Sequence, residues 1–512
     1  MTLKQFYLLI PVILISFVVF SQEIPTPAEK LNFRQVSSYP ELSAFIKQID
    51  RQSDLVSIEK IGVSVKGLEL NALLFSTTDF GKDAGKIKVL IFAQQHGNEQ
   101  SGKEGALLLA RELIKPEYRY LFDRIDFALI PQVNPDGSEM NKRRNANDAD
   151  LNRNHLILTE PETKALHQFF DKYHFEVTMD VHEYSPYGED WVTAGFRKNS
   201  DITLGISTNL NVSEELRKFS ENIALQYLFS FLSKRNFSCF TYCPGDPPGK
   251  GYIRHSTFDI NDGRQSFAIQ NTLSFIQEGM NGVDNFTENL EMRANGQMTG
   301  MKGLLEFVHK RRRSILKLVA EERQKLLSST PNERISIQDE HSSNGNTLQL
   351  PVFSYKSGKD SLVIISDYRP VVRSVTSVEK PLGYLIPESL TELLSWAGRQ
   401  CLESNPYVVR PEDRIEQYTI LDINSIDFEG DTIPDPVVQT GNLNQDQLKN
   451  RYIYIPTNQP KGNLIVLALE PKSMLGLVTY DKFRQLLKAG ESFPVLRLTN
   501  NKPIKNQSHA NR

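Results

Sequence analysis

Short apolar runs alternate with stretches of helical periodicity along the first part of the chain. The apolar runs cover residues 87–93, 125–130, 175–181 and 271–276. Apolar positions three and four apart predict helices over residues 102–114, 161–170, 213–232 and 292–327. Strands that alternate with helices in this way pair as a parallel or mixed sheet with helices on both faces. The pattern predicts an α/β fold with a doubly wound mixed sheet, which we assign to residues 23–327.

The character of the sequence changes after residue 327. Residues 328–347 are polar, contain Pro331, and are predicted to form a linker. Residues 348–499 are predicted to form a smaller β-rich accessory domain, and residues 500–512 a disordered tail. The elements expected in the accessory domain are strands at 361–365 and 463–468 and one helix near 387–397.

The first 22 residues have the pattern of a signal peptide. Lys4 precedes an apolar run at residues 6–20, which is shorter than the roughly 20 residues that a membrane-spanning helix needs. Ser21 and Gln22 follow as candidate cleavage positions. We expect an exported protein, periplasmic or secreted, without a transmembrane span after signal removal. The alternative is an uncleaved N-terminal anchor.

Composition excludes several functional classes. The 59 Lys and Arg residues nearly balance the 62 Asp and Glu residues, for a net charge of −3. No global field therefore attracts nucleic acid or an anionic membrane. Cys239, Cys243 and Cys401 are too few for a disulfide-stapled scaffold. Cys239 and Cys243 could pair after export, or remain free thiols.

A histidine and a glutamate follow the predicted strand at residues 87–93. His96 and Glu99 lie three residues apart, directly after the run that ends at residue 93. In open α/β sheets, ligands bind at the carboxyl ends of the strands. This pair can therefore converge on one cation, although on its own it also suits an ordinary surface turn.

A third donor follows a second strand. His182 comes directly after residues 175–181, so its side chain is expected at the same edge of the sheet as His96 and Glu99. Three protein ligands with one coordination position open are typical of catalytic zinc, whereas structural zinc has four protein ligands. The alternative for His182 is a buried, hydrogen-bonded histidine.

A further carboxylate follows a third strand. Glu278 lies just after residues 271–276. A carboxylate beside a metal-bound water suits a general base that activates the water and later passes the proton to the leaving group. Alone, Glu278 would be a surface acid; together with the donors at two other strand ends, it predicts a hydrolase site.

An arginine-rich segment lies between the predicted ligands. Residues 134–137 read Asn-Pro-Asp-Gly, a strong turn signal, and residues 142–154 contain several arginines and asparagines. Guanidinium groups can bind a carboxylate through two hydrogen bonds and stabilise a developing oxyanion. The alternative is a solvated loop.

With these motifs the chain resembles the zinc carboxypeptidases of the carboxypeptidase A type, over roughly residues 50–320. The features that carry the resemblance occur in the family's order. They are His96 and Glu99, the turn at 134–137, the Asp-Leu-Asn-Arg-Asn segment at 150–154, His182 and Glu278. The resemblance implies that His96, Glu99 and His182 bind one zinc ion, and that Glu278 is the general base and acid.

The same resemblance implies roles for the arginine-rich segment. Asn152 and Arg153 would bind the terminal carboxylate of the substrate. Arg144, with adjacent Arg143 as the competing assignment, would polarise the scissile carbonyl. Asp150 would accept a hydrogen bond from a zinc-binding histidine and orient it.

One family feature has no clear counterpart. Many members place a substrate-capping tyrosine some twenty residues before the catalytic glutamate, but here Tyr252 comes too early and Phe258 lacks a hydroxyl. Residues 243–251 are expected to form a loop over the cleft, which Tyr184, Tyr187 and Trp191 could line or merely flank.

The favoured function is an exported zinc carboxypeptidase acting on a peptide or a peptidoglycan-derived peptide. The alternative enzyme is a zinc-dependent deacylase or amidohydrolase of a small acylated amine. The Asn152–Arg153 pair favours the peptidase, because this pair reads a C-terminal carboxylate in the family. A catalytically dead binding protein is disfavoured, because the three ligands and the base are all present.

Overall fold

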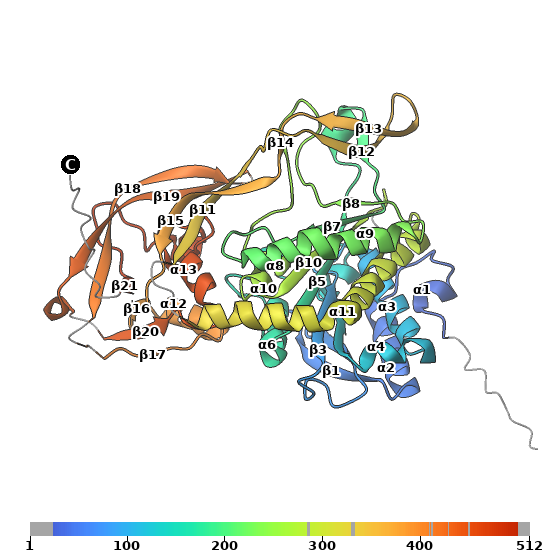
Figure 1. The fold of residues 1–512 in the computed structure, drawn as a ribbon, viewed down its shortest axis with the longest axis horizontal. Helices are drawn as coiled ribbons and strands as arrows, with labels where there is room; N and C mark the ends of the chain where they lie inside the picture. Colours follow the sequence, from blue (N-terminus) through green and yellow to red (C-terminus); the bar gives the residue numbers. More distant parts are fainter. Residues whose placement is uncertain are drawn as a thin grey trace, which may run out of the picture.

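The computed structural model describes residues 24–283, 287–328, 333–408, 410, 413–428, 430–448 and 451–499. The predicted signal peptide and the predicted C-terminal tail therefore lie outside the described residues. Figure 1 shows an α/β half and an elongated β-rich half joined along the long helix α11 (Leu290–Leu327).

An eight-stranded mixed sheet forms the centre of the α/β half. Its strands are β1 (Val56–Val63), β2 (Glu69–Phe75), β3 (Ile87–Ala93), β4 (Ile125–Ile130), β5 (Val177–Tyr184), β7 (Ile202–Ile206), β8 (Cys239–Thr241) and β10 (Leu273–Met280). Their order is β1-β2-β4-β3-β5-β10-β7-β8. The central strands β4, β3, β5 and β10 are parallel, whereas β2 and β7 run antiparallel to β4 and β10. The parallel strands bring their carboxyl ends to one edge.

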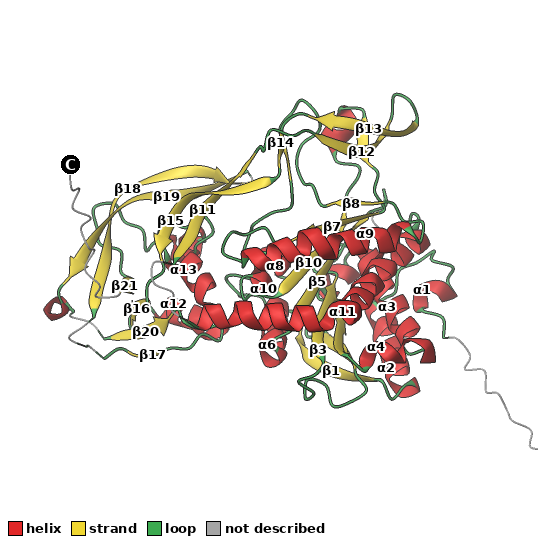
Figure 2. Ribbon diagram, viewed as in Figure 1, coloured by secondary structure: helices red, strands yellow, loops and turns green. Residues whose placement is uncertain are grey.

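Helices cover both faces of this sheet (Figure 2). One face packs against α2 (Tyr39–Gln52), α3 (Gln100–Leu113), α4 (Arg119–Phe122), α8 (Glu214–Phe219), α9 (Leu225–Ser233) and α11. The other packs against α6 (Pro161–Tyr173) and α10 (Gly263–Ala268). In β3, Val89 and Ile91 point into the first of these cores, and Leu90 and Phe92 into the second. Both faces of the strand are thus buried, which explains its continuous apolar sequence.

The predicted fold class is confirmed. The predicted strands at 87–93 and 125–130 coincide with β3 and β4, and the helix expected over 292–327 is part of α11. The strand expected at 271–276 continues as β10 to Met280 and includes Glu278. The helix expected over 213–232 contains a π-helical turn at Ser220–Ala224 between α8 and α9.

A six-stranded sheet and a two-stranded ribbon form the β-rich half. The strands of the sheet are β16 (Gly383–Pro387), β17 (Asn405–Pro406), β18 (Arg414–Phe428), β19 (Asp431–Leu443), β20 (Tyr452–Pro456) and β21 (Leu496–Thr499). The ribbon pairs β11 (Arg334–Ser342) with β15 (Val371–Glu379), and α12 (Thr391–Arg399) and α13 (Gly462–Leu469) pack nearby.

Two local predictions in this half are wrong. Residues 334–342 form β11 rather than part of a linker. Ile335 and Ile337 are buried, and the polar side chain that follows them, Gln338, donates a hydrogen bond to Asp435 at 2.8 Å. Residues 463–468 form most of helix α13 rather than a strand. Every residue of α13 is buried, and a short apolar run without alternation is compatible with either element.

The two halves share one apolar core. Leu156 and Phe258 of the α/β half belong to the same buried cluster as Trp396 and Leu464 of the β-rich half. Asp171 of α6 also forms a 2.7 Å ion pair with Lys461. The predicted domain limits at 327 and 348 therefore do not separate two independent cores.

A β-hairpin of the C-terminal region returns to the α/β half. It consists of β12 (Leu348–Ser354) and β13 (Lys359–Ile365), and β12 pairs with β6 (Phe196–Lys198). The hairpin lies above β7 and β8 in Figure 1. A segment predicted to lie in the accessory domain thus builds part of the α/β half.

Candidate active site

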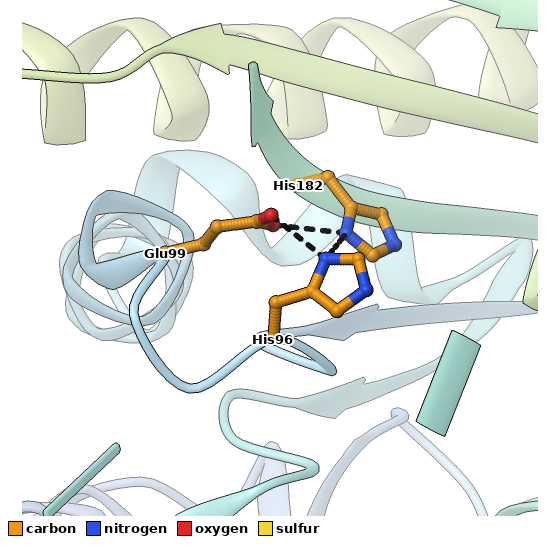
Figure 3. Close-up of side chains that lie close together, drawn as sticks. All are labelled: His96, Glu99 and His182. Atoms are coloured by element: carbon orange, nitrogen blue, oxygen red, sulfur yellow. Dashed lines mark hydrogen bonds and ion pairs between the residues drawn. The ribbon is translucent and has the colours of Figure 1, made fainter. Parts of the chain in front are cut away.

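Two histidines and a glutamate converge at the carboxyl edge of the sheet (Figure 3). His96 lies in the loop after β3, Glu99 is the N-cap residue of α3, and His182 lies in β5. The Nδ1 atoms of the two histidines are 3.1 Å apart and lie 2.7 Å and 2.9 Å from the Glu99 carboxylate oxygens. One donor atom from each residue lies within 4.8 Å of the others. The sequence pattern predicts that these three residues lie close together.

The loop that carries His96 packs tightly against the Asn-Pro-Asp-Gly turn. A Cβ at Gly97 would lie 2.1 Å from the carbonyl carbon of Gly137, so only glycine fits. The Asn134 side chain accepts a hydrogen bond from the Gly137 amide at 2.9 Å and donates one to the Gln95 carbonyl at 3.0 Å. The turn thereby fixes the backbone beside His96.

A carboxylate contacts the outer nitrogen of each imidazole. Asp150 Oδ1 lies 3.1 Å from His96 Nε2, and Asp180 Oδ1 lies 2.9 Å from His182 Nε2. Such contacts fix the tautomer that leaves Nδ1 available to a metal. Sequence reasoning missed Asp180, although its spacing of two residues from His182 in a strand puts both side chains on one face.

This donor set fits zinc. Two imidazole nitrogens and a carboxylate are the ligands of many catalytic zinc sites. Burial favours the neutral form of Glu99, but His96 and His182 outweigh it and hold the pKa of this carboxyl well below its usual range. The ionised glutamate is the form that binds a cation.

Glu278 lies beside the cluster. It is opposite His182 in the parallel register of β10 and β5, and only 8% of its surface is exposed. Its carboxylate has no hydrogen bond or ion pair with any residue that the structure describes. Burial raises the pKa of Glu278 to about 7. The carboxyl group is therefore poised between its two protonation states near neutral pH.

These groups share a cavity of about 330 Å³. Its wall combines the His96–Glu99 pair and Glu278 with residues from the arginine-rich segment and from the region between β5 and β10. The further lining residues are Arg143, Asn152, Arg153, Glu183, Tyr184, Ser185, Lys198, Tyr242, Pro244, Gly245, Thr257, Asp259, Asp262, Arg264 and Ile276. A volume of this order can hold a small ligand.

The two adjacent arginines differ in position. Arg143 lines the cavity and donates to Asp150 Oδ2 at 3.0 Å, whereas Arg144 donates to the Asp148 backbone carbonyl at 2.8 Å and is not part of the cavity wall. The sequence pattern favours Arg144 for polarising a carbonyl, but of the two adjacent arginines only Arg143 lines the cavity.

Asn152 and Arg153 both lie in the wall of the cavity. The side-chain oxygen of Asn152, Oδ1, accepts a hydrogen bond from the Gly263 backbone amide at 2.7 Å. The side-chain nitrogen of Asn152, Nδ2, lies 3.4 Å from His182 Nε2. Arg153 donates to the Asn152 backbone carbonyl at 2.9 Å. The two residues belong to the short 3₁₀ turn at Leu151–Arg153, which is capped by the Asp150 side chain.

The aromatic residues are arranged differently from the family pattern. Phe258 is buried in the core, and Tyr252 lies under the Arg369 guanidinium at 4.1 Å. The tyrosines in the cavity wall are instead Tyr184 and Tyr242, and sequence reasoning missed Tyr242.

Of the other residues predicted near the cleft, Tyr187 and Trp191 are not part of the cavity wall. Trp191 packs in a small core below the β12–β13 hairpin. Cys239 and Cys243 are both free thiols, which answers the question of their pairing for this structure. Burial raises the pKa of Cys243 to about 12, which disfavours the thiolate form.

An open α/β sheet with these donors and a poised carboxylate at its strand ends is the arrangement of a metal-dependent hydrolase. Residues 42–189 match the family model described as zinc carboxypeptidase. Over these residues the chain is similar to the zinc carboxypeptidases, and the match supports a zinc metallocarboxypeptidase as the enzyme class. The resemblance and the enzyme class inferred from the sequence are thereby confirmed.

The chain is also similar to individual carboxypeptidases. Carboxypeptidase 2 from Trichophyton rubrum is 20% identical over 476 residues, which cover 89% of this chain and 86% of that protein. Carboxypeptidase M from Mus musculus is 29% identical over 163 residues, covering 28% of this chain and 37% of that protein. A metallo-carboxypeptidase structure from Burkholderia cenocepacia aligns with a TM-score of 0.42 at 20% identity, covering 54% of this chain and 70% of that one.

In the part of the chain that the structure describes, no helix has both the length and the apolar character that a membrane span requires.

Proposed function

We propose that this enzyme hydrolyses the amide bond before the C-terminal residue of peptides, with Glu278 as general base. The observation that carries the proposal is the position of the buried Glu278 carboxylate, in the same cavity as His96 and Glu99 and opposite His182 in the sheet. A zinc ion held by these three ligands would supply a Lewis acid that polarises the scissile carbonyl and acidifies a bound water.

The remaining chemistry is assigned to the side chains. Glu278 takes a proton from the attacking water and later delivers it to the nitrogen of the leaving amine. Its pKa of about 7 suits both steps, because the carboxylate is basic enough to accept the proton and acidic enough to release it. Arg143 donates hydrogen bonds to the carbonyl oxygen as negative charge develops there.

The exopeptidase character is assigned to Asn152 and Arg153. A guanidinium and a carboxamide in the cavity wall can bind the main-chain carboxylate of the last residue. They would hold the last amide bond of the peptide beside the metal ligands, so that amide bonds further inside the peptide are not cleaved. We infer peptide substrates from the similarity to carboxypeptidases, and no observation favours peptidoglycan-derived peptides.

The test uses an N-blocked dipeptide and its C-terminally amidated counterpart. Glu278→Gln should reduce kcat by roughly 10² to 10⁴-fold while zinc content stays at one ion per chain. Glu214→Gln, an exposed change on α8, is the matched control and should keep wild-type activity. If the amidated peptide is cleaved at a rate similar to that of the free-acid peptide, the deacylase is favoured instead. If Glu278→Gln loses zinc, the role of Glu278 as general base is contradicted.

We also propose that the enzyme is exported. This rests on the sequence pattern of residues 1–22. Expression of the full chain in a Gram-negative bacterium should give a periplasmic product whose N-terminus, read by mass spectrometry, begins close to Ser21 or Gln22. A product that retains Met1 and stays in the cytoplasm would contradict export.

A further inference from the structure

Lys198 places an ammonium group in the wall of the active-site cavity. It is the last residue of β6 and lines the same cavity as Glu278, Arg153 and Tyr242. Its Nζ donates to the Cys243 carbonyl at 2.8 Å and lies 5.2 Å from the centre of the Trp191 ring. Among the described residues, no carboxylate oxygen lies within 4.0 Å of this ammonium.

Two other cations of the cavity wall are already neutralised by ion pairs. Arg264 lies 2.9 Å from Asp262, and Arg143 lies 3.0 Å from Asp150. Burial lowers the pKa of Lys198 to about 8, which leaves it mostly protonated at neutral pH. A largely desolvated ammonium without a carboxylate partner is costly for the protein, and an anionic ligand would compensate for it.

The position of Lys198 is fixed by the C-terminal hairpin. Residues 196–198 pair with Val352–Ser354 of β12, and Asn199 donates to Asp360 of the hairpin at 2.7 Å. The neighbouring Arg197 guanidinium lies 4.9 Å from the Phe353 ring. β6 is the edge strand of the sheet that it forms with the hairpin, and these contacts fix the position of the Lys198 backbone before a ligand binds.

We propose that Lys198 binds an anionic side chain of the substrate's C-terminal residue, so that the enzyme prefers peptides ending in Glu or Asp. The inference rests on the proposed carboxypeptidase function. Arg153 and Lys198 line one cavity from different elements. A C-terminal residue whose main-chain carboxylate binds Arg153 would place its side chain in the same cavity, where a second carboxylate would be a partner for the Lys198 ammonium.

The first experiment compares N-blocked dipeptides that differ only in the last residue: Glu, Gln, Leu or Lys. The wild-type kcat/KM should be about tenfold or more higher for Glu than for the isosteric Gln, the value of a charge-assisted hydrogen bond. Lys198→Met should remove this difference while leaving the Gln and Leu peptides within about threefold of wild type. Lys198→Glu should favour the peptide that ends in Lys.

A matched lysine serves as the control. Lys250 lies in the neighbouring loop, pairs with Asp190 at 2.8 Å and is not part of the cavity wall. Lys250→Met should keep the full preference for Glu. Equal wild-type rates for Glu and Gln, or an equal slowing of all four peptides by Lys198→Met, would overturn the inference and leave the carboxypeptidase function intact.

A binding experiment separates recognition from catalysis. In the Glu278→Gln background, calorimetry should give tighter binding of the Glu peptide than of the Gln peptide, and Lys198→Met should abolish this gap. If the wild type hydrolyses no peptide but the Glu peptide still binds more tightly than the Gln peptide, the proposed function fails and the recognition by Lys198 stands. If the two peptides bind with equal affinity, the inference fails whatever the activity.

Discussion

The indole N–H of Trp396 donates a hydrogen bond to the backbone carbonyl of Leu156 at 2.9 Å. Gln400 adds hydrogen bonds to the carbonyls of His155 and Leu156 at 3.1 Å and 2.7 Å. These backbone groups follow directly after the segment that carries Asn152 and Arg153. The β-rich half therefore supports the chain that presents the proposed carboxylate-binding residues.

Trp396→Phe tests this support. The change removes one hydrogen bond and part of a fully buried ring, so the free energy of unfolding should fall by about 1–3 kcal/mol. Because Leu156 is displaced toward the smaller ring, KM for an N-blocked dipeptide should rise more than kcat falls. Urea unfolding and steady-state kinetics measure the two effects. Tyr355→Phe, at an exposed aromatic, should change neither; a fall in kcat alone would contradict the supporting role.

Much of the α/β half was predictable, because its central strands are buried on both faces. Continuous apolar runs such as β3 identify such strands, and the carboxyl ends of parallel strands must meet at one edge. The sequence pattern therefore predicts that His96, Glu99 and Glu278 lie close together, because each is placed at the carboxyl end of a parallel strand. Their catalytic roles stay predictions until the variants are measured.

The remaining features depend on contacts between distant segments. Asp180 lies within an apolar strand, and its significance appears only when His182 Nε2 is found 2.9 Å away. Lys198 matters because β12, more than 150 residues later in the chain, pairs with its strand. Local periodicity carries no information about such partners, and for the same reason it could not distinguish helix from strand in α13.

The carboxylates behind the histidines should control metal affinity. Asp150→Asn and Asp180→Asn each remove the negative charge that orients an imidazole, and each should weaken zinc binding by about 10 to 100-fold. Competition with a chelator of known affinity measures this effect without reference to activity. Asp148→Asn, an exposed change in the same segment as Asp150, is the control and should bind zinc like the wild type. Unchanged affinity in Asp180→Asn would show that its contact with His182 does not orient the ligand.

The adjacent arginines provide a matched pair. Arg143→Gln should lower kcat by roughly 100-fold or more, because it removes a donor aimed at the developing oxyanion. Arg144→Gln should stay within about twofold of the wild type, since Arg144 contacts only the backbone of its own loop among the partners seen. Initial rates at saturating dipeptide compare the two variants under identical conditions. A larger loss of kcat in Arg144→Gln than in Arg143→Gln would instead assign the polarisation of the carbonyl to Arg144.

The stability of the β-rich half should depend on pH through Asp339. Burial raises the pKa of this carboxyl to about 6, despite hydrogen bonding from Ser336 and the charge of Arg217. The folded state therefore favours the protonated form of Asp339. The resulting contribution to the free energy of unfolding is full below about pH 4 and is lost as the pH rises through 6. Asp339→Asn keeps the neutral shape, so it should stabilise the protein by up to about 3 kcal/mol at pH 8 relative to the wild type, and by little at pH 4. Urea unfolding at both pH values, with the exposed Asp431→Asn as control, measures the difference; a stabilisation that is equal at pH 4 and pH 8 would contradict the assignment.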